Sequence, residues 1–357
     1  MTKYHRLLSL AFSAVILASA TYGFGNSESF IASNPPPSHL TAADPVTLRS
    51  VWAKNFNLET LWKTATGKGV NIAVCDSGFY LGDSDLDENI DWARVLDVIK
   101  RNQVVDDSKF AYQGTASLSI ISAVQNGMGM AGIAYHSKLI PLQHFHYDSE
   151  LDGEVTLPKA GAKCIYQAIK NMDVSIVLLQ SSTYRGSAEA DELIRSAILD
   201  ATKAGLIVVL PAGDASKNLV TEKIFETKSI FVGATLNNGR QALFSNYGDR
   251  VNVGAYGENV EANFGQGRWG SLIGTAAAAA QVTGLVALFK EVNPCLRPDD
   301  VLSLFKLTNQ VDDSNRRVGG LVNPVKALEL AKNMPCQKSK LESELLYRTQ
   351  LLKKMNL

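Results

Sequence analysis

Residues 67–78 read Gly-Lys-Gly-Val-Asn-Ile-Ala-Val-Cys-Asp-Ser-Gly, an apolar run that ends in an acid and a glycine. The run from Val70 to Cys75 has the length of a short strand, and its apolar character predicts a strand buried on both faces. Asp76 follows directly, so we expect its carboxylate at the carboxyl end of that strand.

Further strands and helices alternate along the chain. Helical patterns at Lys159–Asn171 and Ala188–Ala204 separate several of the apolar runs. Such alternation predicts an α/β fold with a mostly parallel sheet and helices on both faces. An Ala-rich run at 273–289 predicts a buried central helix rather than a membrane span, because polar residues and two glycines interrupt it. The other predicted strands are Leu139–Leu142, Ser175–Leu179, Ile207–Leu210, Ile230–Val232 and Val251–Val253.

Size and charge limit the kinds of partner. The chain has 357 residues, 46% of them hydrophobic, with 35 basic and 35 acidic side chains. One large domain at 46–335 accounts for this length. No basic patch or tail stands out, so we expect no nucleic-acid partner.

The two ends of the chain differ from the predicted domain. Residues 1–20 combine a positive start, an apolar run and small residues at Ala18–Ala20, which predicts a cleaved signal peptide. The alternative is an uncleaved anchor, but the run is shorter than the ~20 residues that a span needs. We expect export to the periplasm or the exterior, with no integral span after cleavage. Residues 21–45 form a Pro- and Ser-rich lead-in, and 336–357 a charged helical tail that either docks on the domain or binds a partner.

Four cysteines fit an oxidising compartment without forming a disulfide framework. Cys75 lies in an apolar strand pattern and Cys164 in a helical one, so both are predicted to be core thiols. Cys295 and Cys336 flank the C-terminal part of the domain, and the sequence leaves their pairing open.

Five segments, in this order, resemble the subtilisin-like serine peptidase family and together cover about residues 45–332. The resemblance implies the family's three-layer fold, with Asp76 at the position of the catalytic aspartate. The segments are residues 67–78, residues 112–116 with the following 127–134, residues 210–214, Phe244-Ser-Asn-Tyr-Gly248, and residues 274–284.

The chain departs from the family at the residues that carry the chemistry. Ala276 stands at the nucleophile position, and its methyl group has no lone pair to attack a carbonyl. Gln113 stands at the histidine position, and an amide cannot act as a general base near neutral pH. Asp214 stands at the oxyanion-hole asparagine, where a carboxylate would repel the developing charge. We therefore predict no catalysis, with Asp76 as a turn carboxylate that accepts a hydrogen bond from Gln113.

Other family positions suggest binding sites. Ser181, Ser182 and Thr183 match the strand that holds the substrate backbone. Asp85 and Asn126 match two side-chain ligands of a calcium site, which makes a structural Ca²⁺ possible. No other cofactor is expected.

Few residues offer substitutes for the missing groups. Ser245 and Ser271 lie near the motifs in sequence, but neither begins the helix that presents the nucleophile. His144 and His146 alternate near the end of a predicted strand and suggest a metal only weakly.

Three functions follow from these observations. The leading hypothesis is an exported pseudoenzyme that binds a peptide or protein in the former substrate cleft. The second is a serine-type endopeptidase with a non-standard catalytic apparatus. The third is a structural interaction module of the cell envelope.

Overall fold

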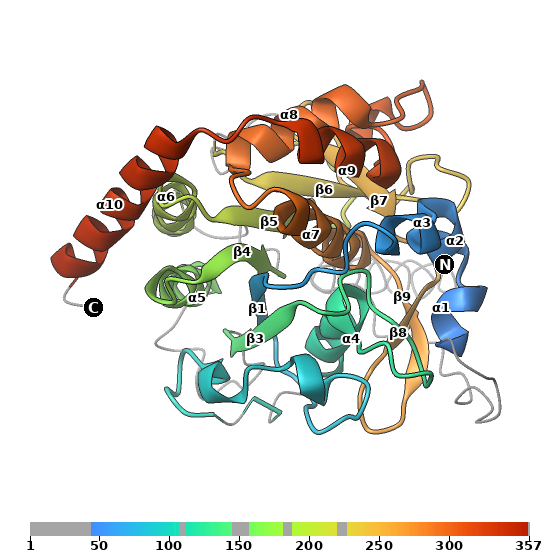
Figure 1. The fold of residues 1–357 in the computed structure, drawn as a ribbon, viewed down its shortest axis with the longest axis horizontal. Helices are drawn as coiled ribbons and strands as arrows, with labels where there is room; N and C mark the ends of the chain where they lie inside the picture. The colour runs from blue at the N-terminus through green and yellow to red at the C-terminus, as the bar shows by residue number, and fades with distance from the viewer. Residues whose placement is uncertain are drawn as a thin grey trace, which may run out of the picture.

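A seven-stranded parallel sheet forms the centre of the molecule (Figure 1), in the order β2-β3-β1-β4-β5-β6-β7. The computed structural model describes residues 44–103, 105–106, 111–144, 157–180, 188–219 and 227–355. The predicted strand Val251–Val253 is shifted, because Val251 closes a turn onto the Gly248 carbonyl and the strand begins at Val253. The strands are β1 Asn71–Asp76, β2 Leu96–Asp97, β3 Lys138–Gln143, β4 Val174–Leu179, β5 Ile207–Pro211, β6 Ile230–Thr235, β7 Val253–Tyr256, and an antiparallel pair, β8 Val260–Asn263 and β9 Trp269–Leu272.

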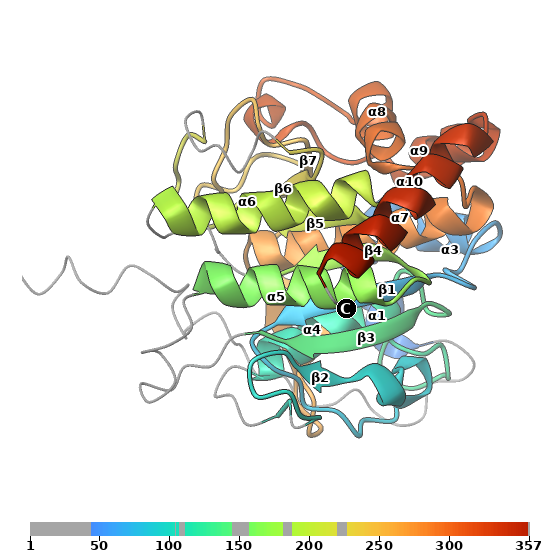
Figure 2. The same cartoon turned by 90° about the vertical axis from the view of Figure 1, so that its left-hand side faces the viewer.

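Helices cover both faces of this sheet, as the alternating pattern predicted (Figures 1 and 2). α4 and α7 lie on one face, α5 and α6 on the other, and α10 crosses the outer side of α5 and α6. The helices are α1 Pro45–Arg49, α2 Val51–Phe56, α3 Leu58–Trp62, α4 Ala111–Ser122, α5 Leu157–Lys170, α6 Ala188–Lys203, α7 Thr275–Val292, α8 Pro298–Thr308, α9 Pro324–Asn333 and α10 Lys338–Lys354.

The central strand shows why the sheet is buried on both sides. Ile72 and Val74 pack with α4 and α7, whereas Ala73 and Cys75 pack with α5 and α6. Alternate residues of a strand point to opposite faces, so a strand covered on both faces is apolar at nearly every position. The three-layer α/β architecture is confirmed.

Helix α7 is the predicted central helix. It runs against β4, β5, β6 and β7 and against α4, and its alanines are fully buried apart from Ala276. Small side chains let it lie close to the sheet and to α4. Among the described residues, no helix has both the length and the apolar character needed to cross a membrane.

Two disulfides cross-link the fold, and one of them corrects the sequence prediction. Cys75 on β1 is bonded to Cys164 on α5, with Cα atoms 6.2 Å apart, so neither is a core thiol. Both side chains point into the layer between the sheet and α5, at a separation that a disulfide spans without distortion. Cys295 and Cys336, whose pairing the sequence left open, are also bonded, with Cα atoms 5.2 Å apart.

Helix α10 docks on the domain through polar side chains. The buried Arg348 guanidinium donates to five backbone carbonyls at the end of α5 and the start of β4, at 2.5–3.3 Å. Glu344, also buried, pairs with Arg297, and the Tyr347 hydroxyl donates to Asp200 at 2.7 Å. Docking on the domain, one of the two alternatives for this tail, is thus observed.

Candidate functional site

The candidate site lies at the carboxyl ends of β1, β4 and β5, where α7 begins. In a parallel sheet these ends share one edge, which is the usual place for ligands. Asp76 ends β1, Gln180 follows β4, and Asp214 follows β5. The fold therefore brings together segments that are far apart in the sequence.

Asp76 is buried at the floor of this site, with 4% of its surface exposed. Its Oδ1 accepts hydrogen bonds from the Ser77 backbone N–H at 2.7 Å and the Ser77 hydroxyl at 3.2 Å. Burial raises the pKa of Asp76 to about 7, and the hydrogen bonds from Ser77 and Ser117 only partly offset that rise.

The partner of Asp76 on α4 is Ser117, not Gln113 as expected. Ser117 Oγ lies 3.1 Å from Asp76 Oδ2 and 3.1 Å from the backbone carbonyl of Gln113, so its single proton is shared between them. Ser117 follows Gln113 by four residues and lies on the same side of α4. That spacing is the signal in the sequence that would have pointed to Ser117.

Gln113 itself is half-buried in the first turn of α4. The next residue, Gly114, fixes how closely α4 approaches the loop after β1. A Cβ atom at Gly114 would lie 2.1 Å from the Gly78 carbonyl oxygen, so only glycine fits there.

Gln180, which the sequence did not single out, joins the two sides of the site. Its Nε2 donates to Ser117 Oγ at 3.0 Å and to the Ala276 carbonyl at 2.9 Å. The side chain is 7% exposed, and its Oε1 has no hydrogen-bond partner among the described residues. A polar residue directly after an otherwise apolar strand was the available signal.

Asp214 lies at the amino terminus of the 18-residue helix α7. Its Oδ1 accepts a hydrogen bond from the Thr275 backbone N–H at 2.8 Å, and the Thr275 hydroxyl accepts one from the Gly213 N–H at 3.0 Å. Gly274 before them has φ 122°, and a Cβ atom there would lie 2.7 Å from Asp214 Oδ2. The carboxylate thus occupies the start of a helix, where the dipole favours negative charge.

The predicted structural motif at 244–248 explains how Asp214 is held. The Asn246 side-chain oxygen accepts from the Ala215 and Lys217 N–H groups at 3.1 and 2.8 Å, and its Nδ2 donates to the Ala212 carbonyl at 2.7 Å. This one side chain fixes the loop on both sides of Asp214. Although the residue as a whole is exposed, burial of its carboxyl group raises the pKa of Asp214, and the hydrogen bonds from Thr275 only partly offset that rise.

Few groups at this site have the chemistry of a nucleophile or a base. Ala276 and Gln113, at the positions that the sequence analysis compared with a nucleophile and a general base, have partly accessible side chains. Two hydroxyls of the described residues at this site, on Ser117 and Thr275, are each 1% exposed. A substrate carbonyl would have to displace packed side chains to reach either oxygen.

Only some of the other residues that the sequence singled out lie in the described part of the chain. Ser181, Ser182, Thr183 and His146 lie outside the described residues. His144 is buried directly after β3, where its backbone N–H donates to the Asp76 backbone carbonyl at 3.0 Å. Ser245 is fully buried and hydrogen-bonded to backbone, and Ser271 lies on β9, which ends before α7 begins.

Asp85 and Asn126 do lie together, with the buried Asp44 beside them. Asp85 Oδ2 accepts from the Met130 N–H at 3.0 Å, and Asp44 Oδ1 accepts from the Asn126 and Gly127 N–H groups at 3.2 Å. Burial, with repulsion from Asp83 and Asp44, raises the pKa of Asp85 to about 7.

Carboxylate and amide oxygens of this kind are the donor type that Ca²⁺ takes in proteins. Asp44 Oδ2 is buried without a hydrogen-bond partner in the part of the chain that is described, and crowded carboxylates are stabilised by a cation. No set of three His, Cys, Asp or Glu side chains in those residues is arranged to hold a metal. Amide and backbone carbonyl oxygens would therefore have to complete the coordination.

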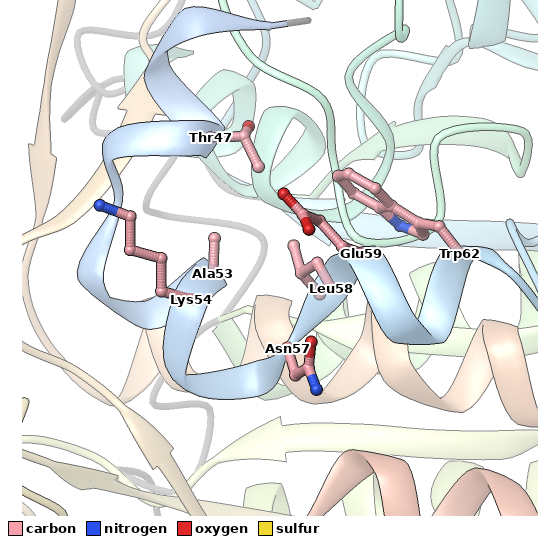
Figure 3. A pocket seen from close by; sticks show the side chains of 7 residues that line it. All are labelled: Thr47, Ala53, Lys54, Asn57, Leu58, Glu59 and Trp62. Carbon is pink, nitrogen blue, oxygen red and sulfur yellow. The ribbon is translucent and has the colours of Figure 1, made fainter.

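A separate pocket lies between the short N-terminal helices (Figure 3). Its volume is about 210 Å³, and neither the residues around Asp76 and Ala276 nor the Asp85 group contributes to its wall. The lining residues are Thr47, Ala53, Lys54, Asn57, Leu58, Glu59 and Trp62.

Comparison with known proteins gives consistent matches. The Peptidase_S8 model of the subtilase family matches residues 67–320. Subtilisin BL of Lederbergia lenta is 27% identical over 259 residues, covering 72% of this chain and 90% of that protein. An extracellular protease of Xanthomonas campestris is 26% identical over 289 residues, covering 71% of this chain but 49% of its own length.

A solved structure agrees with the fold. The protease of Pseudoalteromonas arctica PAMC 21717 superposes with a TM-score of 0.62 at 25% identity, over 77% of this chain and 94% of that structure.

Proposed function

Since the chain belongs to the subtilase family, we propose that it binds a peptide or protein in the family's substrate cleft and does not hydrolyse it. The observation that carries this proposal is the set of side chains at the key positions. A methyl group at Ala276, an amide at Gln113 and a carboxylate at Asp214 replace the hydroxyl, imidazole and hydrogen-bond donor that acyl transfer needs.

The contacts of Asp214 give this proposal its second support. Its carboxylate accepts the Thr275 N–H at the start of α7. An oxyanion generated beside that helix terminus would meet a negative charge in place of a donor, and a single such donor is ordinarily worth about 3 kcal/mol. Restoring only the hydroxyl and the imidazole would leave that repulsion in place.

The buried hydroxyls support the same conclusion. Ser117 is next to a carboxylate whose pKa is near neutral, an arrangement that recruits a serine as nucleophile in principle. Its side chain is 1% exposed, and Gln180 and Gln113 contact its oxygen. Ser117 therefore serves as a structural link between α4 and β1 in this proposal.

A bound peptide would dissociate unchanged, because no covalent intermediate forms. Residues 181–183, directly after Gln180, are proposed to pair with its backbone as an added strand. Binding of this kind suits a peptide receptor or an assembly partner.

We propose further that the protein is exported. Residues 1–20 have the pattern of a signal peptide, and both disulfides belong to an oxidising compartment. The Xanthomonas relative is named as an extracellular protease. Periplasm and exterior are both compatible with these features.

A structural Ca²⁺ beside Asp85 is a separate proposal. Asp85, Asn126 and the unpartnered oxygen of Asp44 would supply side-chain ligands, and the ion would offset the repulsion among the carboxylates. The ion would join the loop after β1 to the loop after α4 and would take no part in binding peptide.

A fluorophosphonate probe tests the proposed lack of catalysis, because it labels only an activated serine. We expect no labelling of the folded protein, with an active subtilisin labelled in parallel as the positive control. Labelling that disappears on unfolding would contradict the proposal, and replacing Ser117 or Thr275 in turn would then identify the nucleophile.

A further inference from the structure

Two leucines of α10 are exposed on the outer side of the helix. Leu345 and Leu346 are 56% and 59% exposed. Leu346 lies two residues from both Glu344 and Arg348, the buried side chains that anchor α10, and a step of two residues turns an α-helix by about 200°. The anchors therefore hold Leu346 away from the domain, with Leu345 beside it. Figure 2 shows α10 in front of α5 and α6, so this side of the helix faces outward.

Lysines flank this leucine pair in both directions along the helix. Lys338 precedes Leu345 by seven residues, and Lys353 follows Leu346 by seven. Seven residues are almost two helical turns, so both lysines lie on the same side of α10 as the leucines. The exposed surface of the helix is therefore basic and has an apolar centre. Its exposed charged residues are four lysines and one acid: Lys338, Lys340, Lys353, Lys354 and Glu342.

Two more exposed lysines lie beside α10, at the ends of the helices that it crosses. Lys170 lies among the carbonyls at the end of α5 that Arg348 binds. Lys203, at the end of α6, lies two residues before Gly205, where a Cβ atom would be 2.8 Å from Glu344 Oε2. Within the described ranges, none of these six lysines forms an ion pair. The fold thus gathers positive charge from three helices onto one surface.

A basic surface with an apolar centre has the chemistry that an anionic lipid membrane binds. Anionic headgroups attract nearby lysines, each of which strengthens binding about fivefold. Exposed leucines enter the boundary between headgroups and acyl chains, while the long lysine stems let the charged ends stay in water. An acidic macromolecule without an apolar phase would use the lysines but would leave the leucines in water. The combination therefore favours a lipid surface.

We infer that α10 holds the protein peripherally on an anionic membrane surface, through Leu345, Leu346 and the lysines around them. The candidate site lies at the other end of the sheet. Arg348 binds the Val174 carbonyl at the start of β4, whereas Gln180 follows the end of that strand. The six residues of β4 span about 20 Å, so the site stays open to solvent while α10 contacts lipid. This inference does not depend on peptide binding.

Co-sedimentation with vesicles tests the inference through two matched double variants of the full chain. The vesicles are phosphatidylcholine alone or with about 30% phosphatidylglycerol, which is anionic. Leu346→Ser with Lys353→Gln should weaken binding to the anionic vesicles about 20-fold. Leu307→Ser with Lys306→Gln makes the same changes on the exposed side of α8, where Leu307 is 64% exposed, and should leave binding unchanged. Both variants keep residues 1–20, so any contribution of that apolar run to binding is the same in each.

A tryptophan at the contact gives a local readout. The emission of Leu346→Trp, relative to wild type, should shift to shorter wavelength with the anionic vesicles and not with phosphatidylcholine alone. An unshifted emission, or equal binding of the two double variants, would overturn the inference. Self-association without lipid that Leu346→Ser abolishes, measured by analytical ultracentrifugation, would assign this surface to a second copy of the chain and overturn it too. None of these results bears on the proposed peptide binding.

Discussion

Replacing Asp76 by asparagine should remove a pH-dependent loss of stability. Burial raises the pKa of Asp76 from its ordinary value near 4 to about 7 in the folded protein. Between those two values the folded state holds a proton that the unfolded state has released, so stability falls as pH rises through this window. Below the window both states are protonated, and the stabilising difference is fully present.

The size of the effect follows from the shift. About three pKa units at 1.36 kcal/mol each give a loss of about 4 kcal/mol on going from pH 4 to above pH 7, as an upper bound. Asparagine keeps the shape of the side chain and cannot ionise. Ser117 can then direct its hydroxyl proton to the Gln113 carbonyl, which already lies 3.1 Å away.

Urea unfolding of wild type and Asp76→Asn at pH 5 and pH 8 measures the difference. We expect the variant to gain stability relative to wild type by up to about 2.7 kcal/mol between the two pH values, since about two pKa units of the window lie above pH 5. Asp85, whose pKa is also raised, contributes equally to both proteins and cancels. Asp249→Asn serves as the control for removal of an exposed charge. Parallel pH profiles for wild type and Asp76→Asn would refute the assignment of Asp76 as a buried, near-neutral acid.

Three further outcomes can be checked by unfolding experiments. Arg348→Met should lower the free energy of unfolding by about 2–4 kcal/mol and speed hydrogen exchange in α10, because five backbone carbonyls lose their donor. Lys353→Met changes an exposed residue of the same helix and should have neither effect. Equal exchange rates in the two variants would contradict the docking of α10. Replacing Cys75 and Cys164 together by alanine should lower the free energy of unfolding by about 2–5 kcal/mol, and two titratable thiols in unreduced wild type would rule that disulfide out. Millimolar Ca²⁺ should raise the melting temperature of wild type but not of Asp85→Asn; equal shifts would place any bound ion elsewhere.

Most strands of the sheet were predictable because their burial on both faces leaves an apolar run in the sequence. The two-residue edge strand β2 was not predicted, since it is too short to leave such a run. The predicted strands Val70–Cys75 and Ile207–Leu210 match β1 and β5 to within one residue at each end. The pair β8 and β9 was missed, since Val260–Asn263 and Trp269–Leu272 mix polar and apolar residues over four positions each. Helices α1 to α3 were missed for a similar reason, because helices of five or six residues carry too little periodicity.

The contacts of the site were harder to foresee than its positions. Motif spacing located Asp76, Gln113, Asp214 and Ala276, but which hydroxyl faces Asp76 depends on how α4 lies against β1. Pairing of Cys75 with Cys164 depends on that same kind of tertiary contact, across 89 residues of sequence. Periodicity within one segment cannot report a distance between two segments.

Cleavage in heavy-oxygen water tests the central claim most directly. A peptide library is incubated with the folded wild-type protein in ¹⁸O-labelled water, and mass spectrometry detects every new carboxyl terminus by its label. Our account predicts no more labelled products than with heat-unfolded protein. Labelled products of one consistent specificity, lost when a single side chain of this chain is replaced, would contradict it.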